Sequence, residues 1–162
     1  MTLGQTITLR PARVDEAAAL SALTHRSKQS HGYSDEFMAL FMSFGDMVIT
    51  PELIAQNPVM VAEIDGWVAG FAHLKPLDQP DAVCLEDLFI EPDAQGRGVG
   101  RVLFDWALAT AAERGYDWLE WESDPNAAGF YEKMGGEKIG ETKSTIIEGR
   151  VLPMYRMPTG RN

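Results

Sequence analysis

Glycine alternates with other residues in the segment QGRGVG, residues 95–100, which runs directly into an apolar stretch with helical spacing. A glycine inside a helix costs about 1 kcal/mol relative to alanine, so three glycines are an unfavourable way to begin one. The first amides of a helix have no internal partners and carry the positive end of its dipole. Without Cβ atoms at Gly96, Gly98 and Gly100, an anion can approach those amides closely. The segment therefore predicts a phosphate-binding loop; the alternative is a tight turn whose glycines serve packing alone.

The residues around these glycines exclude two known kinds of phosphate-binding loop. Arg97 and Arg101 add formal positive charge to the loop and to the first turn of the expected helix. A Walker loop requires a lysine after its last glycine, and a dinucleotide fingerprint requires the spacing GxGxxG, whereas this loop has GxGxG. The loop also lies past the middle of the chain and does not follow the first strand of a βαβ unit. The spacing excludes both motifs.

Two acids lie side by side in the apolar segment AVCLEDLFI, residues 82–90, just before the loop. Burying both Glu86 and Asp87 would be costly, and the alternation of a strand sends them to opposite faces. A bulge in the strand would bring both toward one cleft. The alternative is one solvated acid and one acid that accepts a structural hydrogen bond.

Composition bounds the class of protein. The chain has 162 residues, which predicts a single domain over 1–162 with a sizeable core. Fourteen Lys and Arg residues against 24 Asp and Glu residues give a formal net charge of −10. This charge argues against binding to nucleic acid or to an anionic membrane and favours a cationic small substrate, unless it serves solubility alone.

Cysteine and histidine are sparse. Cys84 is the single cysteine, so neither an internal disulfide nor a cysteine metal cluster can form, and the three histidines lack the spacing of a zinc site. We therefore expect no metal. Residues 1–10 contain no apolar core of a signal peptide, and no apolar run approaches the ~18 residues of a membrane helix. We expect a cytoplasmic protein.

Periodicity predicts an alternation of strands and helices. Asp65-Gly66, between two β-branched and aromatic segments, is a strong signal for a hairpin turn. Strands are expected at 7–9, 82–90, 116–123, near 136–147 and at 150–157, with the hairpin over 58–77; helices are expected at 14–28, 35–44, from Pro51, at 98–114 and at 125–135. This order predicts an α/β or α+β layer around a mixed sheet.

The segment 95–100 has the pattern Gln-x-x-Gly-x-Gly, the signature of acetyl-CoA binding in the GNAT superfamily of N-acetyltransferases. The chain resembles that superfamily over nearly its whole length, through LEDLFIEP upstream, NAAGFYEKMGGEK downstream and the order of its elements. The resemblance implies a central, mixed, mostly antiparallel twisted sheet of about seven strands, flanked by about four helices and splayed at the cofactor strand.

The resemblance also implies acetyl-CoA as co-substrate. Amides of the loop would hold the pyrophosphate, backbone groups of Leu88 and Ile90 would pair with the pantetheine arm as an added strand, and Asn126 would contact that arm. The residues assigned to acetyl-CoA are Leu88, Phe89, Ile90, Gln95, Gly96, Arg97, Gly98, Val99, Gly100, Arg101, Asn126 and Tyr131.

Catalytic roles follow from the same resemblance. Tyr131 matches the family tyrosine that reaches the sulfur of CoA and would supply a proton to it; the alternative is a core tyrosine beside Phe130. The string LEDLFI is similar to LEDFFV of spermidine/spermine acetyltransferase, which makes Glu86 the base, directly or through a water, and Asp87 the amine anchor. Cys84 stands where the histone-acetylating branch has its glutamate, which argues against that type of lysine acetylation. A nucleophilic role for this cysteine is not expected.

The resemblance places the acceptor pocket in segments 24–44 and 144–157. Lys28, His31 and Tyr33 would line it, unless they are capped or solvated loop residues. The Phe- and Met-rich helix at 35–44 is core, or part of a lid or a homodimer interface. We expect acetylation of a small amine, such as a polyamine, amino acid or amine-bearing antibiotic; the alternatives are a protein N-terminus or lysine, and a catalytically silent CoA-binding module.

Overall fold

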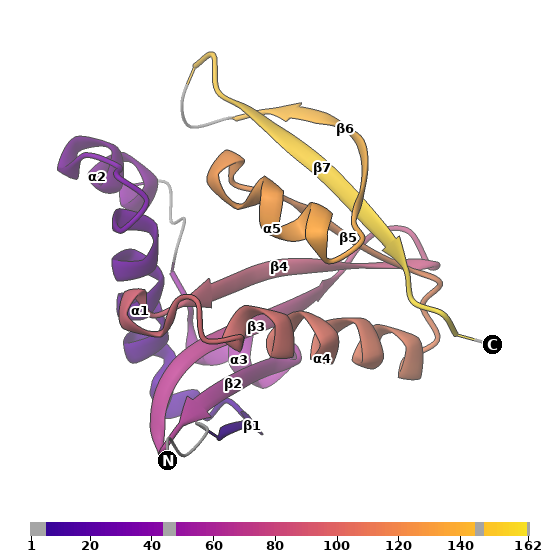
Figure 1. The fold of residues 1–162 in the computed structure, drawn as a ribbon, viewed down its shortest axis with the longest axis horizontal. Coiled ribbons are helices and arrows are strands. Elements are labelled where there is room, and N and C mark those ends of the chain that lie inside the picture. Colours follow the sequence, from indigo (N-terminus) through magenta and orange to yellow (C-terminus); the bar gives the residue numbers. More distant parts are fainter. Residues whose placement is uncertain (1–5, 44–47, 145–147, 162) are drawn as a thin grey trace. The chain divides into compact units, whose positions relative to one another are not determined.

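The computed structural model describes residues 6–43, 48–144 and 148–161. They fall into two compact units: the first contains the described residues within 1–73 and 87–105, and the second those within 74–86 and 106–162. The strands are β1 (Ile7–Pro11), β2 (Val59–Ile64), β3 (Trp67–Pro76), β4 (Ala82–Ile90), β5 (Trp118–Glu122), β6 (Glu137–Lys143) and β7 (Val151–Pro158). The helices are α1 (Ala17–Gln29), α2 (Asp35–Ser43), α3 (Pro51–Gln56), α4 (Val99–Glu113) and α5 (Ala128–Lys133) (Figure 1).

The seven strands form one sheet in the order β1-β2-β3-β4-β5-β7-β6. β4 and β5 are parallel, whereas β1 with β2, β2 with β3, β5 with β7 and β6 with β7 are antiparallel. The mixed, mostly antiparallel sheet of seven strands is therefore confirmed. The described residues contain one α-helix more than the resemblance implied, namely the short α3, which begins at Pro51 as its sequence predicts.

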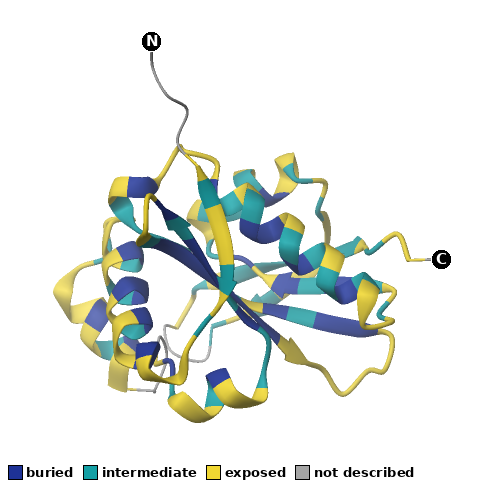
Figure 2. Cartoon of the chain, turned by 90° about the horizontal axis from the view of Figure 1, so that it is seen from below, coloured by how far each residue is buried: buried dark blue, intermediate teal, exposed yellow. Residues whose placement is uncertain are grey.

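The first unit contains an apolar core between α1, α3 and the strands β2 and β3. Leu20 and Leu23 of α1 pack with Val61 of β2 and Phe71 of β3, and all four are buried. In Figure 2 buried residues recur as bands along the helices, as expected where one face of a helix packs on a sheet. The turn between β2 and β3 has positive φ at Asp65 (49°) and Gly66 (86°), as the Asp-Gly signal predicts for a type I′ hairpin.

The start of α1 is tied to β1 by a charged cluster. Arg10 donates from Nη1 and Nη2 to the two carboxylate oxygens of Glu16 at 2.8 Å each, and the backbone amide of Arg13 donates to the same carboxylate at 2.9 Å. These hydrogen bonds lower the pKa of Glu16 from 4.5 to about 2, and the bond from Arg10 is the largest cause. Glu16 is buried, so the ionised carboxylate depends on these donors.

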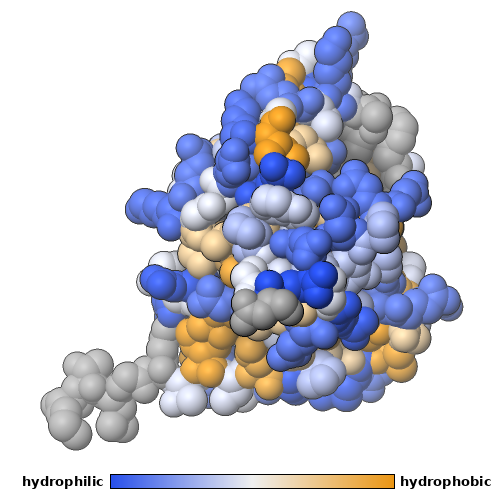
Figure 3. All heavy atoms as spheres, turned by 90° about the vertical axis from the view of Figure 1, so that its right-hand side faces the viewer, coloured by the Kyte–Doolittle hydropathy of each residue, from blue (hydrophilic) through white to orange (hydrophobic). Residues whose placement is uncertain are grey.

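The second unit contains the antiparallel pair β6 and β7 (orange to yellow in Figure 1), together with β5 and α5. Its core includes Trp121 and Tyr155, whose rings stack with centroids 6.0 Å apart. The face in Figure 3 is mostly hydrophilic, with hydrophobic side chains in separate small patches. Within the described ranges, none of the helices is long and apolar enough to cross a membrane.

Candidate active site

The glycine loop lies between β4 and α4, in the first unit. Gly96 and Gly98 have φ of 79° and 86°, in the left-handed region that favours glycine. A Cβ built on either residue would meet no atom within 4 Å, so packing does not account for these two glycines. Their left-handed backbone conformation explains why glycine is present at both positions. The space next to them is open. Val102 donates to the carbonyl of Gly98 at 3.2 Å, which marks the first turn of α4.

The other loop residues are also exposed, apart from Val99 and Gly100. Arg97 and Arg101 extend from the loop and the first turn as exposed side chains. Val99 is buried and anchors the helix, while Gly100 is half-buried beside it. Open, left-handed backbone at a helix N-terminus, with two cations, is an arrangement that can bind a phosphate group.

β4 leads from the parallel pairing into this loop. Its register with β5 covers Ala82 to Cys84, paired with Trp118 to Glu120, and the strand continues to Ile90 beyond that register. The pairing therefore ends in the first half of β4, in agreement with the expected splay. Leu88 and Ile90, whose backbone groups were expected to pair with the pantetheine arm, follow with Phe89 in the half-buried second half.

The second half of β4 is held against β3 by a close approach at Gly70. A Cβ at Gly70 would lie 2.8 Å from the carbonyl oxygen of Phe89, 2.9 Å from Cδ1 of Ile90 and 3.2 Å from Cγ1 of Val99. The ring of Phe89 lies 6.1 Å from that of Phe71 in the core. The strand before the loop is thus anchored on both faces. Sequence reasoning missed Gly70, although a glycine inside a strand is a recognised sign of close backbone approach.

The two adjacent acids have different environments. Glu86 is exposed, and the thiol of Cys84 donates to its Oε2 at 3.4 Å. The side chain of Asp87 is 17% exposed, and its Oδ2 lies 2.8 Å from Nδ1 of His73. His73 itself is buried, with 2% of its surface exposed. Asp87 therefore has a buried histidine partner, which sequence reasoning missed because the two residues are joined only by the pairing of β3 with β4.

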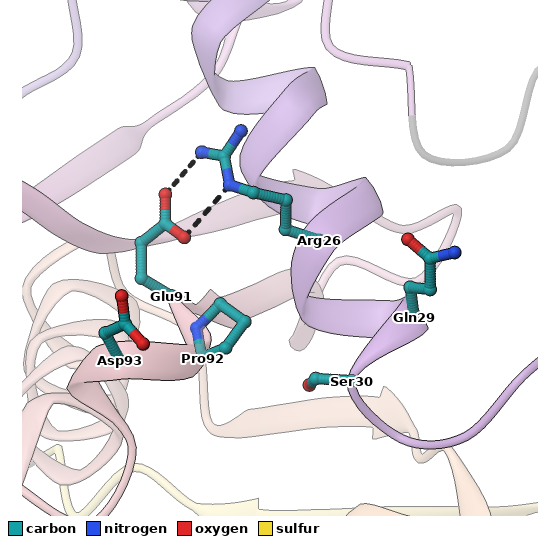
Figure 4. A pocket seen from close by; sticks show the side chains of 6 residues that line it. All are labelled: Arg26, Gln29, Ser30, Glu91, Pro92 and Asp93. Carbon is teal, nitrogen blue, oxygen red and sulfur yellow. Dashed lines mark hydrogen bonds and ion pairs between the residues drawn. The ribbon is translucent and has the colours of Figure 1, made fainter.

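A hollow beside the loop is formed by the end of α1 and the residues that follow β4 (Figure 4). Arg26 donates from Nε to Oε2 of Glu91 at 3.1 Å, and from Nη2 to the other carboxylate oxygen. This contact raises the pKa of Arg26. The ion pair joins α1 to the segment just before the glycines. The hollow is lined by Arg26, Gln29, Ser30, Glu91, Pro92 and Asp93.

Gln95, the first residue of the motif, connects to the same helix. Its Nε2 lies 3.5 Å from Oγ of Ser30, at the limit of a hydrogen bond. Neither this contact nor the pair of Arg26 with Glu91 follows from sequence spacing, because the partners are far apart along the chain.

Tyr131 lies on α5, in the second unit, within an aromatic cluster. It is buried, and its ring centroid lies 5.1 Å from that of Trp121, 5.2 Å from that of Phe130 and 6.4 Å from that of Tyr155. Tyr155 donates its hydroxyl to Glu132 at 3.1 Å. Burial is the largest cause of the raised pKa of Tyr155, and this hydrogen bond is the next. The cluster fixes the ring of Tyr131, which suits both a core residue and a positioned proton donor.

Asn126 lies in the turn before α5 and is exposed. Its backbone amide and its Nδ2 both donate to Oδ1 of Asp124 at 2.9 Å. Asp124 is itself bound by Arg150, whose Nη2 lies 3.1 Å from Oδ2. One hydrogen of Nδ2 is therefore engaged locally, whereas its second hydrogen and the side-chain carbonyl oxygen make no hydrogen bond within the described residues.

Two of the three expected acceptor residues lie together. Nζ of Lys28 lies 5.6 Å from the ring centroid of Tyr33 and 4.5 Å from that of Phe41, which is buried in α2. His31, which lies between Lys28 and Tyr33 in the sequence, is exposed.

The expected Phe- and Met-rich helix is α2. In this helix Met38 is buried, whereas Phe37 and Met42 are exposed. Phe44 and residues 145–147, which belong to the expected acceptor segments, lie outside the described residues.

Comparisons with known proteins show the family of the chain. The model of the Acetyltransferase (GNAT) family matches residues 19–136. The peptidyl-lysine N-acetyltransferase YjaB of Salmonella typhimurium is 31% identical over 158 residues, covering 93% of this chain and 97% of that protein. The chain therefore belongs to the GNAT family of acetyltransferases, and it is an N-acetyltransferase.

Solved structures show the same fold. A GCN5-related N-acetyltransferase from Rhodopseudomonas palustris has a TM-score of 0.79 at 26% identity, over 98% of this chain and 99% of that one. The structure of yncA from Salmonella typhimurium with acetyl-CoA has a TM-score of 0.67 at 19% identity, over 96% and 95% of the two chains. No group of three or more His, Cys, Asp or Glu side chains in the described ranges is placed to hold a metal ion.

Proposed function

We propose that this chain transfers the acetyl group of acetyl-CoA directly to a primary alkyl amine. The observation that carries the proposal is the open loop at the start of α4, with Gly96 and Gly98 in the left-handed region, directly after the strand whose pairing with β5 ends at Cys84. A loop of this kind binds phosphate, and strand backbone beyond its pairing register can accept an extended ligand.

The residues present fit acetyl-CoA. The loop amides from Gly96 to Arg101, with Arg97 and Arg101 as cations, would hold the diphosphate. The space next to Gly96 and Gly98 is open and leaves room for it. Leu88 and Ile90 would hold the pantetheine arm through their backbone groups, and Asn126 through its carbonyl oxygen. When bound, acetyl-CoA supplies the acetyl group as a thioester. The family membership and the acetyl-CoA complex of a protein with this fold support the assignment.

The chain's own groups would manage protons and charge. An alkylammonium has no lone pair, so it must give up a proton before it attacks; Glu86, which is exposed and therefore exchanges protons with solvent, would hold that proton. Asp87 would bind the amine. The backbone amide of Ile90 would donate to the developing oxyanion, and the hydroxyl of Tyr131 would supply a proton to the departing sulfur.

The chemical class of the acceptor amine is the more specific part of the proposal. The acidic chain and the recessed carboxylate of Asp87 favour an amine on a flexible alkyl stem, which describes a polyamine or another small cationic molecule. A lysine side chain of a protein has the same chemistry, and the name of the relative YjaB favours it as a second candidate. Cys84, in place of the glutamate of the histone-acetylating branch, argues for the small molecule.

The test is release of CoA thiol from acetyl-CoA in the presence of the purified protein and a panel of amines: spermidine, single amino acids, an aminoglycoside and lysine-containing peptides. Mass spectrometry of the acceptor identifies the acetylated nitrogen. We expect turnover with a small alkyl amine. Faster turnover with the peptides would favour the second candidate, and CoA binding without turnover on any acceptor would favour a catalytically silent CoA-binding module.

A further inference from the structure

Among the described residues, the buried imidazole of His73 has one polar contact, and that contact is with Asp87. Nδ1 of His73 lies 2.8 Å from Oδ2 of Asp87, and both residues belong to the first unit. We infer that His73 is a positioning residue for the carboxylate that binds the acceptor amine. The inference rests on the proposed acetyl transfer.

Packing does not account for a histidine at this position. In the sheet His73 pairs with Val59 of β2, and Phe71, two residues earlier on the same face of β3, is fully buried. Nε2 of His73 is buried and has no hydrogen-bond partner within the described residues. An unmade hydrogen bond of this kind costs about 1–3 kcal/mol, whereas an aliphatic side chain would fill the same place without that cost. The unpartnered Nε2 thus disfavours folding, and the contact of Nδ1 with Asp87 is what the histidine supplies and an aliphatic side chain would not.

Asp87 has one oxygen engaged and one available. Oδ2 accepts from His73, and no donor within the described ranges lies at hydrogen-bonding distance from Oδ1. The side chain is 17% exposed, so solvent and a small ligand can reach it. An ammonium group is a donor with formal positive charge, and it makes its strongest hydrogen bonds to an ionised carboxylate. Oδ1 is thus the oxygen to which the amine would donate.

The contact with Asp87 fixes which ring nitrogen of His73 acts as the donor. A carboxylate only accepts, so Nδ1 of His73 carries the hydrogen, and in the neutral ring Nε2 then carries none. The imidazole orients the carboxylate through this one N–H. A lysine or arginine in place of His73 would hold Asp87 equally well but would compete with the amine for the same negative charge. His73 therefore orients Asp87 through Oδ2 and leaves Oδ1 to the acceptor.

Matched substitutions at His73 test this inference. His73→Asn keeps an N–H donor close to the position of Nδ1, whereas His73→Leu keeps the volume and removes the donor. With the amine identified by thiol release, we expect His73→Leu to raise the KM for the amine about tenfold, with the KM for acetyl-CoA unchanged. His73→Asn should recover most of that loss. The Tm of His73→Leu should equal or exceed that of the unsubstituted protein, because the unpartnered Nε2 is gone.

A double substitution separates positioning from packing. On the background of Asp87→Asn, His73→Leu should change the KM for the amine no further, because the carboxylate that it orients is absent. Equal KM values for the amine in the unsubstituted enzyme and in His73→Leu would overturn the inference and leave the proposed function intact. Equal losses in His73→Asn and His73→Leu would overturn it too. No turnover by the unsubstituted enzyme on any amine would overturn the proposed function and this inference with it.

Discussion

Gly70 of β3 and Phe89 of β4 approach so closely that no side chain fits between them: a Cβ on Gly70 would lie 2.8 Å from the carbonyl oxygen of Phe89. That carbonyl belongs to the strand assigned to the pantetheine arm, and the residue that follows it, Ile90, would be displaced as well. The glycine thus sets how closely the two strands pack just before the phosphate loop.

Gly70→Ala is expected to lower the free energy of unfolding by about 1–3 kcal/mol, because overpacking a filled site forces backbone shifts. It should also raise the KM for acetyl-CoA, since the displaced atoms belong to the strand proposed to bind the pantetheine arm. Urea denaturation and steady-state kinetics measure the two effects. The matched control is Gly129→Ala on α5, where a Cβ would meet nothing within 4 Å; a neutral or stabilising effect is expected there. Equal stability of the two variants would contradict the close approach.

Gly98→Ala is expected to lose affinity for CoA about tenfold or more, because a left-handed φ of 86° disfavours alanine by roughly 1–2 kcal/mol and the loop amides would turn away from the ligand. Gly115→Ala, at a φ of 89° after the end of α4, carries the same backbone penalty away from the loop. Isothermal titration with CoA should show full affinity for the Gly115 variant. A similar loss in both variants would mean that folding, and not the loop, was affected.

Tyr131→Phe is expected to lower kcat about 10²-fold with little change in the KM for acetyl-CoA, because only the proton donor is removed. Tyr155→Phe is the matched control, since its hydroxyl donates to Glu132 and the proposed mechanism gives it no role. That variant should keep its kcat and lose about 1 kcal/mol of stability. Unchanged acetylation by Tyr131→Phe would leave this tyrosine as a core residue of the aromatic cluster.

Glu16 makes stability depend on pH. Its pKa in the folded protein, about 2, lies below its ordinary value of 4.5, so the unfolded state binds the proton more readily. The stabilisation is therefore present above pH 4.5 and is lost as the pH falls toward 2. Glu16→Gln should lower the free energy of unfolding by about 2 kcal/mol at pH 7 and flatten its pH dependence in that window, as followed by denaturation at each pH. An equally steep acid transition in the variant would place the responsible carboxylate elsewhere.

Local signals in the sequence were sufficient for most of the fold. The turn at Asp65-Gly66, the strand 82–90 and the helix expected at 98–114 appear within a residue or two of their predicted bounds, because each depends on neighbours in the chain. The fully buried positions of α4, such as Leu103 and Ala107, follow from helical periodicity in the same way.

The rest of the site depends on contacts that spacing does not encode. Asp87 was expected to be an amine anchor, but its partner His73 is visible only once β3 and β4 are paired. The ion pair of Arg26 with Glu91 likewise joins α1 to a segment 65 positions further along. The motif therefore indicated the family and the loop, whereas the partners of Asp87 and Glu91 could be found only in the tertiary structure.

The central claim is that the backbone amides between Gly96 and Arg101 bind the diphosphate of coenzyme A. A crystal structure of the complex with CoA tests it most directly. We predict diphosphate oxygens at about 2.7–3.2 Å from those amide nitrogens, with the pantetheine arm along Leu88 to Ile90. A CoA molecule whose diphosphate contacts other residues, or a protein that takes up none at saturating concentration, would contradict the account.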